Sequence, residues 1–146
     1  MNKQEQAKKY FMQGYNCSQA VFATFCEDFG IDVNTGLKLS SSFGGGMGGL
    51  RNVCGAVTAM FMIAGLKYGY TDASDISLKT EHYKLIQNLA NQFNAKFGSI
   101  ICKELLMSIA NIKKDVSLPE KRTDNYYKTR PCEKFVIYAT ELIENM

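Results

Sequence analysis

A run of glycines that leads directly into a wholly apolar segment constrains this chain more than any other feature. Five of the six residues 44–49 are glycine, and the segment Val53–Leu66 is then apolar except at Gly55, Thr58 and Gly65. A helix that is apolar all round has no face to offer to water, so it packs at the centre of a bundle. The segment is also shorter than the roughly 20 residues that a membrane span requires. We therefore expect a buried central helix.

Elsewhere the apolar residues recur with helical spacing, and no stretch alternates as a strand would. The chain has 146 residues, of which 46% are apolar, so it can form one core without disulfide bonds. We predict an all-α, single-domain bundle of about five to seven helices over residues 1–146, built around the central helix. The other predicted helices span residues 3–13, 17–29, 35–42, 72–97, 99–109 and 131–143, and the polar segment 113–129 is a connection with at most one helical turn.

Short local signals predict where several helices begin and end. Asn16, with Gln19 three residues later, has capping-box spacing at the start of the second helix. Gly30 is placed to end that helix, as a C-terminal glycine does. Ser99 is the predicted cap of the helix through residue 109, and Pro131 is predicted to open the last helix.

The longest predicted helix follows the central one. Thr71 or Asp72 is its predicted cap, and Gly98 is its predicted end. One face of this helix carries regularly spaced apolar residues, which we expect to pack on the core. This predicted buried stripe comprises Ile76, Tyr83, Ile86, Leu89, Ala90, Phe93 and Phe97.

The cysteine content bears most directly on function, because the chain has five cysteines and one histidine. Cytosolic proteins rarely keep structural disulfides, so cysteines there indicate metal binding, redox exchange or buried thiols. No C-x-x-C pair occurs, which excludes the thioredoxin and zinc-ribbon patterns. His82 alone cannot supply a histidine-rich metal site, and we expect it to be a surface or half-buried helix residue.

Four of the cysteines fall in the first turn of a predicted helix, namely Cys17, Cys54, Cys102 and Cys132. A helix N-terminus presents unpaired N–H groups and partial positive charge, which favour the thiolate. These four are therefore the candidate catalytic residues and, in an alternative interpretation, four metal ligands. Cys26 follows Cys17 by nine residues, which is half a turn out of phase on a helix, so we expect it to face away.

The glycine run permits two interpretations. Its backbone N–H groups, with Arg51 as a counter-charge, would suit a phosphate or another anion. However, neither the P-loop pattern nor the dinucleotide-binding pattern is present. We favour the second interpretation, in which glycines allow the backbone to approach neighbouring helices or a cysteine site closely. The candidate cofactor-binding residues are Gly45, Gly46, Gly48, Gly49 and Gly55.

The formal charge of +3 is concentrated in one region. Between Lys103 and Lys134 there are eight Lys and Arg against five Asp and Glu, whereas the rest of the chain balances at nine against nine. An excess this small is typical of a solvated loop face, so we expect no nucleic-acid partner. The N-terminal residues are polar, with no apolar signal core and no twin arginines, which predicts a cytoplasmic protein without membrane insertion.

Several short motifs occur in a fixed order along the chain. They are NCSQAV around Cys17, FGGGMGG, CGAVTA from Cys54, FGSIICKELL around Cys102 and PCEKFV around Cys132. Together they resemble the C_GCAxxG_C_C family of redox-active proteins, which four cysteines and a CGAxxG signature define. The resemblance covers nearly the whole chain, from about residue 13 to residue 143, but Ala59 stands where the signature ends in glycine.

The resemblance implies a redox role for the four cysteines, with Gly55 and Ala56 as motif residues, and it does not include Cys26. Members are often encoded near oxidoreductases or transporters, so the implied partner is an oxidoreductase or another redox protein. Some members carry export signals that suggest a bound prosthetic group. This chain lacks such a signal, so export is not carried over.

Three hypotheses follow from the residues. In the first, the thiolate of Cys54 or Cys17 attacks a disulfide or oxidant, and a second cysteine resolves the intermediate. All three complete pairings of the four cysteines stay open, and electron transfer is a variant of this hypothesis. In the second, the four cysteines bind zinc or an iron–sulfur cluster, although 37, 48 and 30 residues separate them. In the third, the chain is a non-catalytic helical interaction module whose thiols only pack. A homo-oligomer is left open in each case.

Overall fold

The computed structural model describes residues 1–112 and 118–146. Helices dominate these residues, and the only β pairing among them is an isolated bridge. The elements are α1 (Lys3–Met12), α2 (Cys17–Phe25), the 3₁₀ helix η1 (Cys26–Phe29), α3 (Val33–Ser41), the short turn α4 (Gly44–Met47), α5 (Gly55–Tyr68), α6 (Ile76–Phe97), α7 (Cys102–Ala110), α8 (Asp124–Thr129) and α9 (Cys132–Glu144).

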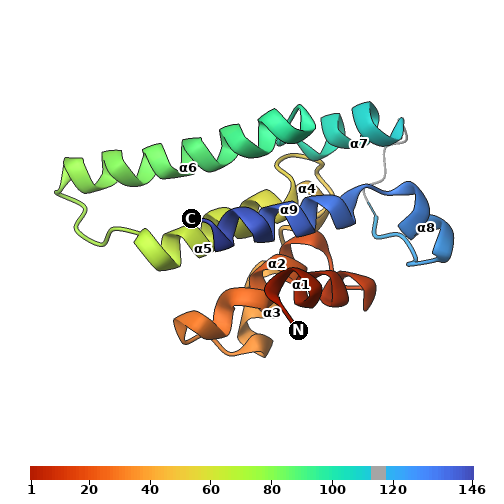
Figure 1. The fold of residues 1–146 in the computed structure, drawn as a ribbon, viewed down its shortest axis with the longest axis horizontal. Coiled ribbons are helices and arrows are strands. Elements are labelled where there is room, and N and C mark those ends of the chain that lie inside the picture. Colours follow the sequence, from red (N-terminus) through yellow and green to blue (C-terminus); the bar gives the residue numbers. More distant parts are fainter. Residues whose placement is uncertain (113–117) are drawn as a thin grey trace.

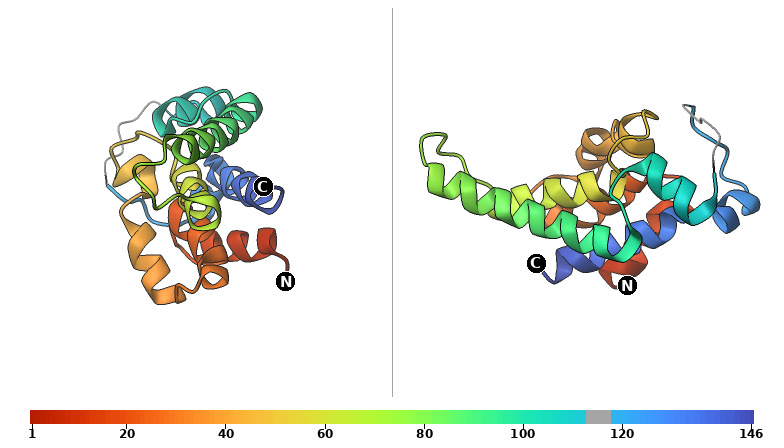
Figure 2. Two further views of the ribbon diagram at one scale, coloured as in Figure 1. Left: turned by 90° about the vertical axis from the view of Figure 1, so that its left-hand side faces the viewer. Right: turned by 90° about the horizontal axis from the view of Figure 1, so that it is seen from above.

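The helices form three layers. In Figure 1, α6 and α7 run along one side, α5 and α9 lie in the middle, and α1, α2 and α3 lie on the other side. The end-on view of Figure 2 shows the same order. Helix α5 packs against α2, α9 and α6, and α9 also packs against α1 and α2. The predicted all-α architecture is thus confirmed, and short helices such as α8 add to the expected number.

Helix α5 is the buried central helix that its composition predicts. Ala56, Val57, Ala59, Met60 and Ile63 have no exposed surface. The helix begins at Gly55, two residues later than the apolar run, because the chain at residue 53 pairs with residue 101 as a β bridge. Its last turn leaves the core, since residues 66 and 68 are 41% and 50% exposed.

The N-terminal helices follow their capping signals. The Asn16 side chain accepts the N–H of Gln19, and the Gln19 side chain accepts the N–H of Asn16, which is the predicted capping box. Gly30 ends the segment in a left-handed conformation with φ of 79°. The α-helix itself stops at Phe25, four residues short of the prediction, and tightens into η1 before this glycine.

The long helix α6 differs from its prediction at its start. Asp75 caps it instead of Thr71 or Asp72, and the Asp72 carboxylate accepts from Ser74 in the preceding turn. The predicted stripe is buried only in its second half, at residues 89 and 93, whereas Ile76 is 73% exposed. The reason is length: α6 has 22 residues and α5 has 14, so the first turns of α6 project beyond the bundle (Figure 1).

The other predicted helix boundaries agree only in part with the structure. Gly98 ends α6 in the left-handed conformation, and Pro131 directly precedes α9. Ser99 is not the N-cap of α7, which is Ile101, although the Ser99 hydroxyl accepts the N–H of Ile101. The predicted connection contains one short helix, α8, and its residues 113–117 lie outside the described residues.

The half-buried His82 on α6 matches its prediction. Among the described residues, no helix combines the length and the apolar character that crossing a membrane requires.

The unequal burial along α6 predicts unequal effects of truncation. Phe93→Ala removes a fully buried ring that contacts the rings of Phe97 and Phe135, so we expect it to lower the free energy of unfolding by about 3–5 kcal/mol. Tyr83→Ala alters a side chain that is 53% exposed, so the change should stay within about 0.5 kcal/mol. Urea denaturation followed by circular dichroism measures both. Equal losses for the two variants would contradict this account of α6.

Candidate functional site

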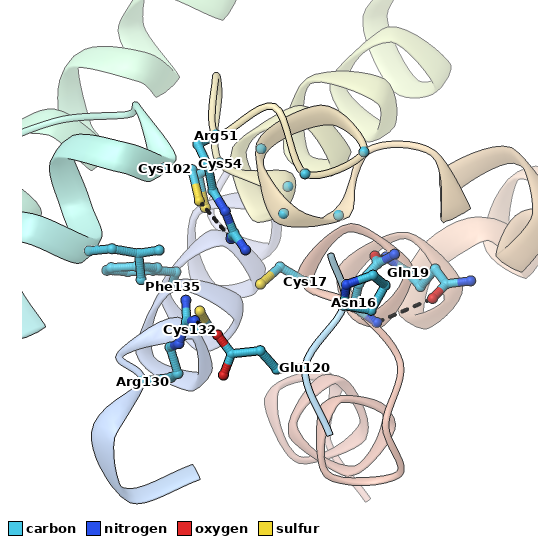
Figure 3. A pocket seen from close by; sticks show the side chains of 18 of the residues that line it. Asn16, Cys17, Gln19, Arg51, Cys54, Cys102, Glu120, Arg130, Cys132 and Phe135 are labelled. Carbon is cyan, nitrogen blue, oxygen red and sulfur yellow. Dashed lines mark hydrogen bonds and ion pairs between the residues drawn. The ribbon is translucent and has the colours of Figure 1, made fainter. Parts of the chain in front are cut away.

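Four of the five cysteines line one cavity of about 380 Å³. Cys17, Cys102 and Cys132 are the first residues of α2, α7 and α9, and Cys54 is the N-cap of α5. The predicted placement at four helix starts is therefore what the structure shows. Figure 3 shows these four side chains around the cavity. All are thiols and are buried, with 3–9% of their surface exposed.

Cys26 lies outside this group, as its helical phase predicts. Its thiol is fully buried, lies near the carbonyl oxygens of Ala23 and Asp32 at 3.8 and 3.9 Å, and does not line the cavity. A side chain at Gly36 would lie 2.6 Å from the Cys26 sulfur, so this thiol fills space between α2 and α3. Burial raises the pKa of Cys26, in keeping with a packing role.

The glycine segment forms one wall of the cavity. The predicted cofactor-binding residues Gly45, Gly46, Gly48, Gly49 and Gly55 all line it. Gly46 is the tightest of them, since a Cβ there would lie 2.7 Å from Arg51 Cα, Asn52 N and Cys102 Cβ. The backbone at Gly46 also has φ of 66°, which a side chain disfavours. This glycine therefore lets the loop pass directly over the start of α7.

Gly55 serves a second close approach. A Cβ there would lie 2.8 Å from the carbonyl oxygen of Phe43 and 3.0 Å from the nitrogen of Ser18. The start of α5 can consequently sit against the start of α2, which brings Cys54 and Cys17 to the same cavity. The Asn16 amide separately links the start of α2 to the end of α3 by donating to the carbonyl oxygen of Ser41 at 3.1 Å.

Backbone hydrogen bonds join the starts of α5 and α7. The N–H of Cys54 donates to the carbonyl oxygen of Ile100 at 2.8 Å, and the N–H of Cys102 donates to that of Asn52 at 2.6 Å. These bonds surround the Val53–Ile101 bridge. These backbone hydrogen bonds hold Cys54 and Cys102 on adjacent segments of the chain and do not involve their sulfurs.

Three arginines and one glutamate are the charged lining residues among those that the structure describes. Arg51 donates to the Cys102 sulfur at 3.6 Å (Figure 3). Arg130, only 8% exposed, forms an ion pair with Glu120 beside Cys132. Arg122 donates to the carbonyl oxygens of residues 11 and 15 at 3.1 and 2.9 Å. The cavity is therefore positively charged around its thiols.

Cys17 and Cys132 affect each other's acidity in opposite directions. The interaction with the Cys17 thiol is the main reason why the pKa of Cys132 is lowered. The charges of Arg130, Arg122 and Arg51 lower the pKa of Cys132 further, against the opposing effect of its burial. The same interaction, together with burial, raises the pKa of Cys17 well above its ordinary value. Cys132 is therefore the more acidic thiol of the pair.

The other two thiols are less acidic than their positions suggest. Burial raises the pKa of Cys54 to about 12, although the N–H groups of Ala56 and Val57 at the helix start act in the opposite direction. Burial also raises the pKa of Cys102, against the hydrogen bond and charge of Arg51. The pKa is thus raised at both Cys54 and Cys17, the two thiols expected to attack, because at Cys54 desolvation outweighs the helix N-terminus and at Cys17 burial adds to the interaction with Cys132.

Four cysteines around one cavity raise the question of a metal or cluster. In residues 1–112 and 118–146, no group of three or more Cys, His, Asp or Glu side chains is arranged so that it could hold a metal ion. Zinc and iron–sulfur clusters need such convergence of thiolates. The four thiols as placed do not form this ligand set, and we derive no chemistry through a metal.

The cavity arginines were not among the residues singled out by the sequence, apart from Arg51. The basic excess after residue 103 predicted a solvated loop face, but Arg130 is buried and Arg122 is half-buried, and both line the cavity. The correction follows from the fold, since residues 118–130 pass over the starts of α2 and α9. Arg130 lies two residues before Cys132, and this spacing was the one available signal.

One comparison with known proteins gives a match. Residues 15–146 match the family model described as "Putative redox-active protein (C_GCAxxG_C_C)". Neither the curated proteins nor the solved structures compared with the chain give a match.

The close approach at Gly46 predicts a large cost for the smallest side chain. Gly46→Ala forces alanine into the left-handed conformation of this position, which costs about 1–2 kcal/mol. Overpacking costs a further 1–3 kcal/mol or so, and we therefore expect the free energy of unfolding to fall by about 2–5 kcal/mol. Gly65→Ala in α5 is the matched control, since its Cβ would meet nothing within 4 Å. That change should stabilise the protein by about 0.5–1 kcal/mol. Chemical denaturation tests both, and a neutral Gly46→Ala would contradict the packing described.

The opposite pKa shifts of Cys17 and Cys132 predict an order of reactivity among the thiols. Because the pKa of Cys132 is lowered, its thiolate forms at a lower pH than an ordinary thiol, and iodoacetamide should label it first as the pH rises. Cys17→Ala removes the donor and should move the labelling of Cys132 to higher pH. Cys17→Ser keeps a hydroxyl donor and should move it less. Labelling is read per cysteine by peptide mass, and labelling of Cys54 before Cys132 would refute this order.

Proposed function

The chain belongs to the C_GCAxxG_C_C family of redox-active proteins, and we propose that it carries out thiol–disulfide exchange with Cys132 as the attacking thiolate and Cys17 as the resolving thiol. One observation carries this proposal: these two thiols line the same cavity and interact, with the pKa of one lowered and that of the other raised. Of the three pairings that the sequence leaves open, the proposal selects the one that joins Cys17 to Cys132.

The proposed first step is attack on a disulfide substrate. The Cys132 thiolate attacks one sulfur of the substrate, the substrate S–S bond breaks, and the other sulfur leaves as a thiolate. A mixed disulfide between Cys132 and the substrate results. Arg130, Arg122 and Arg51 favour the anionic form of Cys132 beforehand through their charge.

The second step resolves the mixed disulfide. Once Cys132 carries the substrate, it no longer accepts the proton of Cys17, and the cause that chiefly raises the pKa of Cys17 is removed. Cys17 can then lose its proton to the departing thiolate and attack the Cys132 sulfur. The second half of the substrate leaves as a thiolate and takes a proton from water, and Cys17 and Cys132 are joined. Overall, the protein gives up two electrons and the proton of Cys17, and one disulfide becomes two thiols.

Cys54 and Cys102 have a different place in this proposal. Burial raises the pKa of both, so neither supplies the attacking thiolate at neutral pH. They line the same cavity, and in the proposal they contact the substrate beside the reacting pair.

Mild oxidation should join one defined pair. We expect the reduced protein, treated with excess bis(2-hydroxyethyl) disulfide, to lose two hydrogens and to regain them with a reductant. Peptide mapping of the alkylated protein should place the new bond between Cys17 and Cys132. Cys132→Ser should abolish it, and Cys26→Ala should leave its rate unchanged, since Cys26 lies outside the cavity. A bond that joins any other pair, or the absence of a bond, would overturn the proposed function.

A further inference from the structure

The burial of the four thiols limits what can reach them. Each is at most 9% exposed, and all lie inside a cavity of about 380 Å³. This volume is within the range of about 300–1,000 Å³ that is common for small-molecule sites. A disulfide on the surface of a folded protein is attached to backbone on both sides and does not enter such a cavity. A small, unattached disulfide does.

The charge of the cavity limits the substrate further. Arg130 is compensated by its ion pair with Glu120. Arg122 has a different environment: its hydrogen-bond partners are the carbonyl oxygens of Phe11 and Tyr15, and no acidic side chain among the described residues forms an ion pair with it. Carbonyl groups leave the charge of a guanidinium in place, so this residue keeps a positive charge at the edge of the cavity.

Arg122 is also held rigidly. Its guanidinium lies 4.5 Å from the ring centre of Phe11 and 4.8 Å from that of Tyr126, while its two hydrogen bonds fix it to the end of α1. A guanidinium has five N–H donors in a planar fork that matches a carboxylate. Two donor nitrogens are engaged with the chain, and further N–H groups remain for a ligand. Fixing the group in advance lowers the entropy cost of binding.

We propose that the cavity takes a small disulfide that carries a carboxylate, and that Arg122 recognises the carboxylate while Cys132 attacks the disulfide. This inference rests on the proposed function and names the substrate class for the same site. The reaction is the one described above, in which the substrate disulfide is reduced to two thiols and Cys17 and Cys132 become a disulfide. The substrate brings the only oxidant that the step needs.

Substrate charge gives a direct test. Three disulfides of similar length serve as substrates: 3,3′-dithiodipropionate, which is a dianion, bis(2-hydroxyethyl) disulfide, which is neutral, and cystamine, which is a dication. The second-order rate of formation of the Cys17–Cys132 disulfide is measured with the reduced protein by alkylation quench and mass spectrometry. Each rate is divided by the rate of the same disulfide with 2-mercaptoethanol at the same pH, which removes differences in intrinsic reactivity.

We expect the dianion to react about tenfold or more faster than the dication after this correction, with the neutral disulfide between them. At high salt the ratio should fall toward one, because mobile ions screen the charge. Arg122→Gln should remove most of the preference, and Arg122→Lys should keep much of it. Lys84→Gln on the exposed part of α6 makes the same change in net charge and should leave the ratio unchanged.

The ratio of the corrected rates distinguishes recognition of the carboxylate by Arg122 from an effect on the acidity of Cys132. Arg122→Gln also alters the environment of Cys132, but a change in thiolate fraction affects all three substrates equally and cancels in the ratio. Equal corrected rates for the three disulfides would overturn the substrate inference and leave the proposed exchange intact. A preference that Arg122→Gln does not reduce would overturn the role of Arg122. Failure of all three to produce the Cys17–Cys132 disulfide would overturn both the function and the inference.

Discussion

The site depends on the close approach of backbone segments around the Gly44–Gly49 loop. At Gly46 the loop lies so near to Asn52 and Cys102 that a methyl group would lie 2.7 Å from both, and Gly55 allows a similar contact between α5 and α2. These contacts bring the starts of α2, α5 and α7 together at one cavity, which the start of α9 also lines, although their cysteines are far apart in the chain. Without them, four cysteines at four helix starts would be four separate sites.

Two opposing effects decide which of the gathered thiols is ionised. Partial positive charge at a helix start favours a thiolate, while removal from water favours the neutral thiol. At Cys54 burial prevails, and its pKa rises to about 12. At Cys132 the interaction with Cys17 and the charges of three arginines prevail over burial. The helix start is common to all four sulfurs, so it cannot be what distinguishes Cys132. Its neighbours distinguish it, and these come from α2, from residues 118–130 and from Arg51.

Much of the helical architecture could be predicted because its causes are local. The Asn16 capping box, the left-handed glycines at residues 30 and 98, and the apolar composition of α5 each involve residues close together in sequence. The predictions that were wrong depend on what a helix meets in space. Ile76 has the spacing of a buried residue but lies beyond the end of α5, and Arg130 lies in the basic region expected to be solvated but is covered by the fold. The spacing of apolar residues shows which face of a helix is apolar, but it does not show where the partner helix ends.

The sequence by itself determined that the chain is helical, that α5 is buried, and that four cysteines stand at helix starts, because capping, glycine conformation and apolar spacing act over a few residues. Only the tertiary structure decided that Cys17 interacts with Cys132, that Arg122 and Arg130 line the cavity, and that the four thiols are not arranged as a metal ligand set among the described residues. These features depend on distances between segments that are 30 to 115 residues apart in the chain, which separation in sequence does not specify. Desolvation is likewise a property of the whole fold, so the ionisation of each thiol follows from packing and from its neighbours in space.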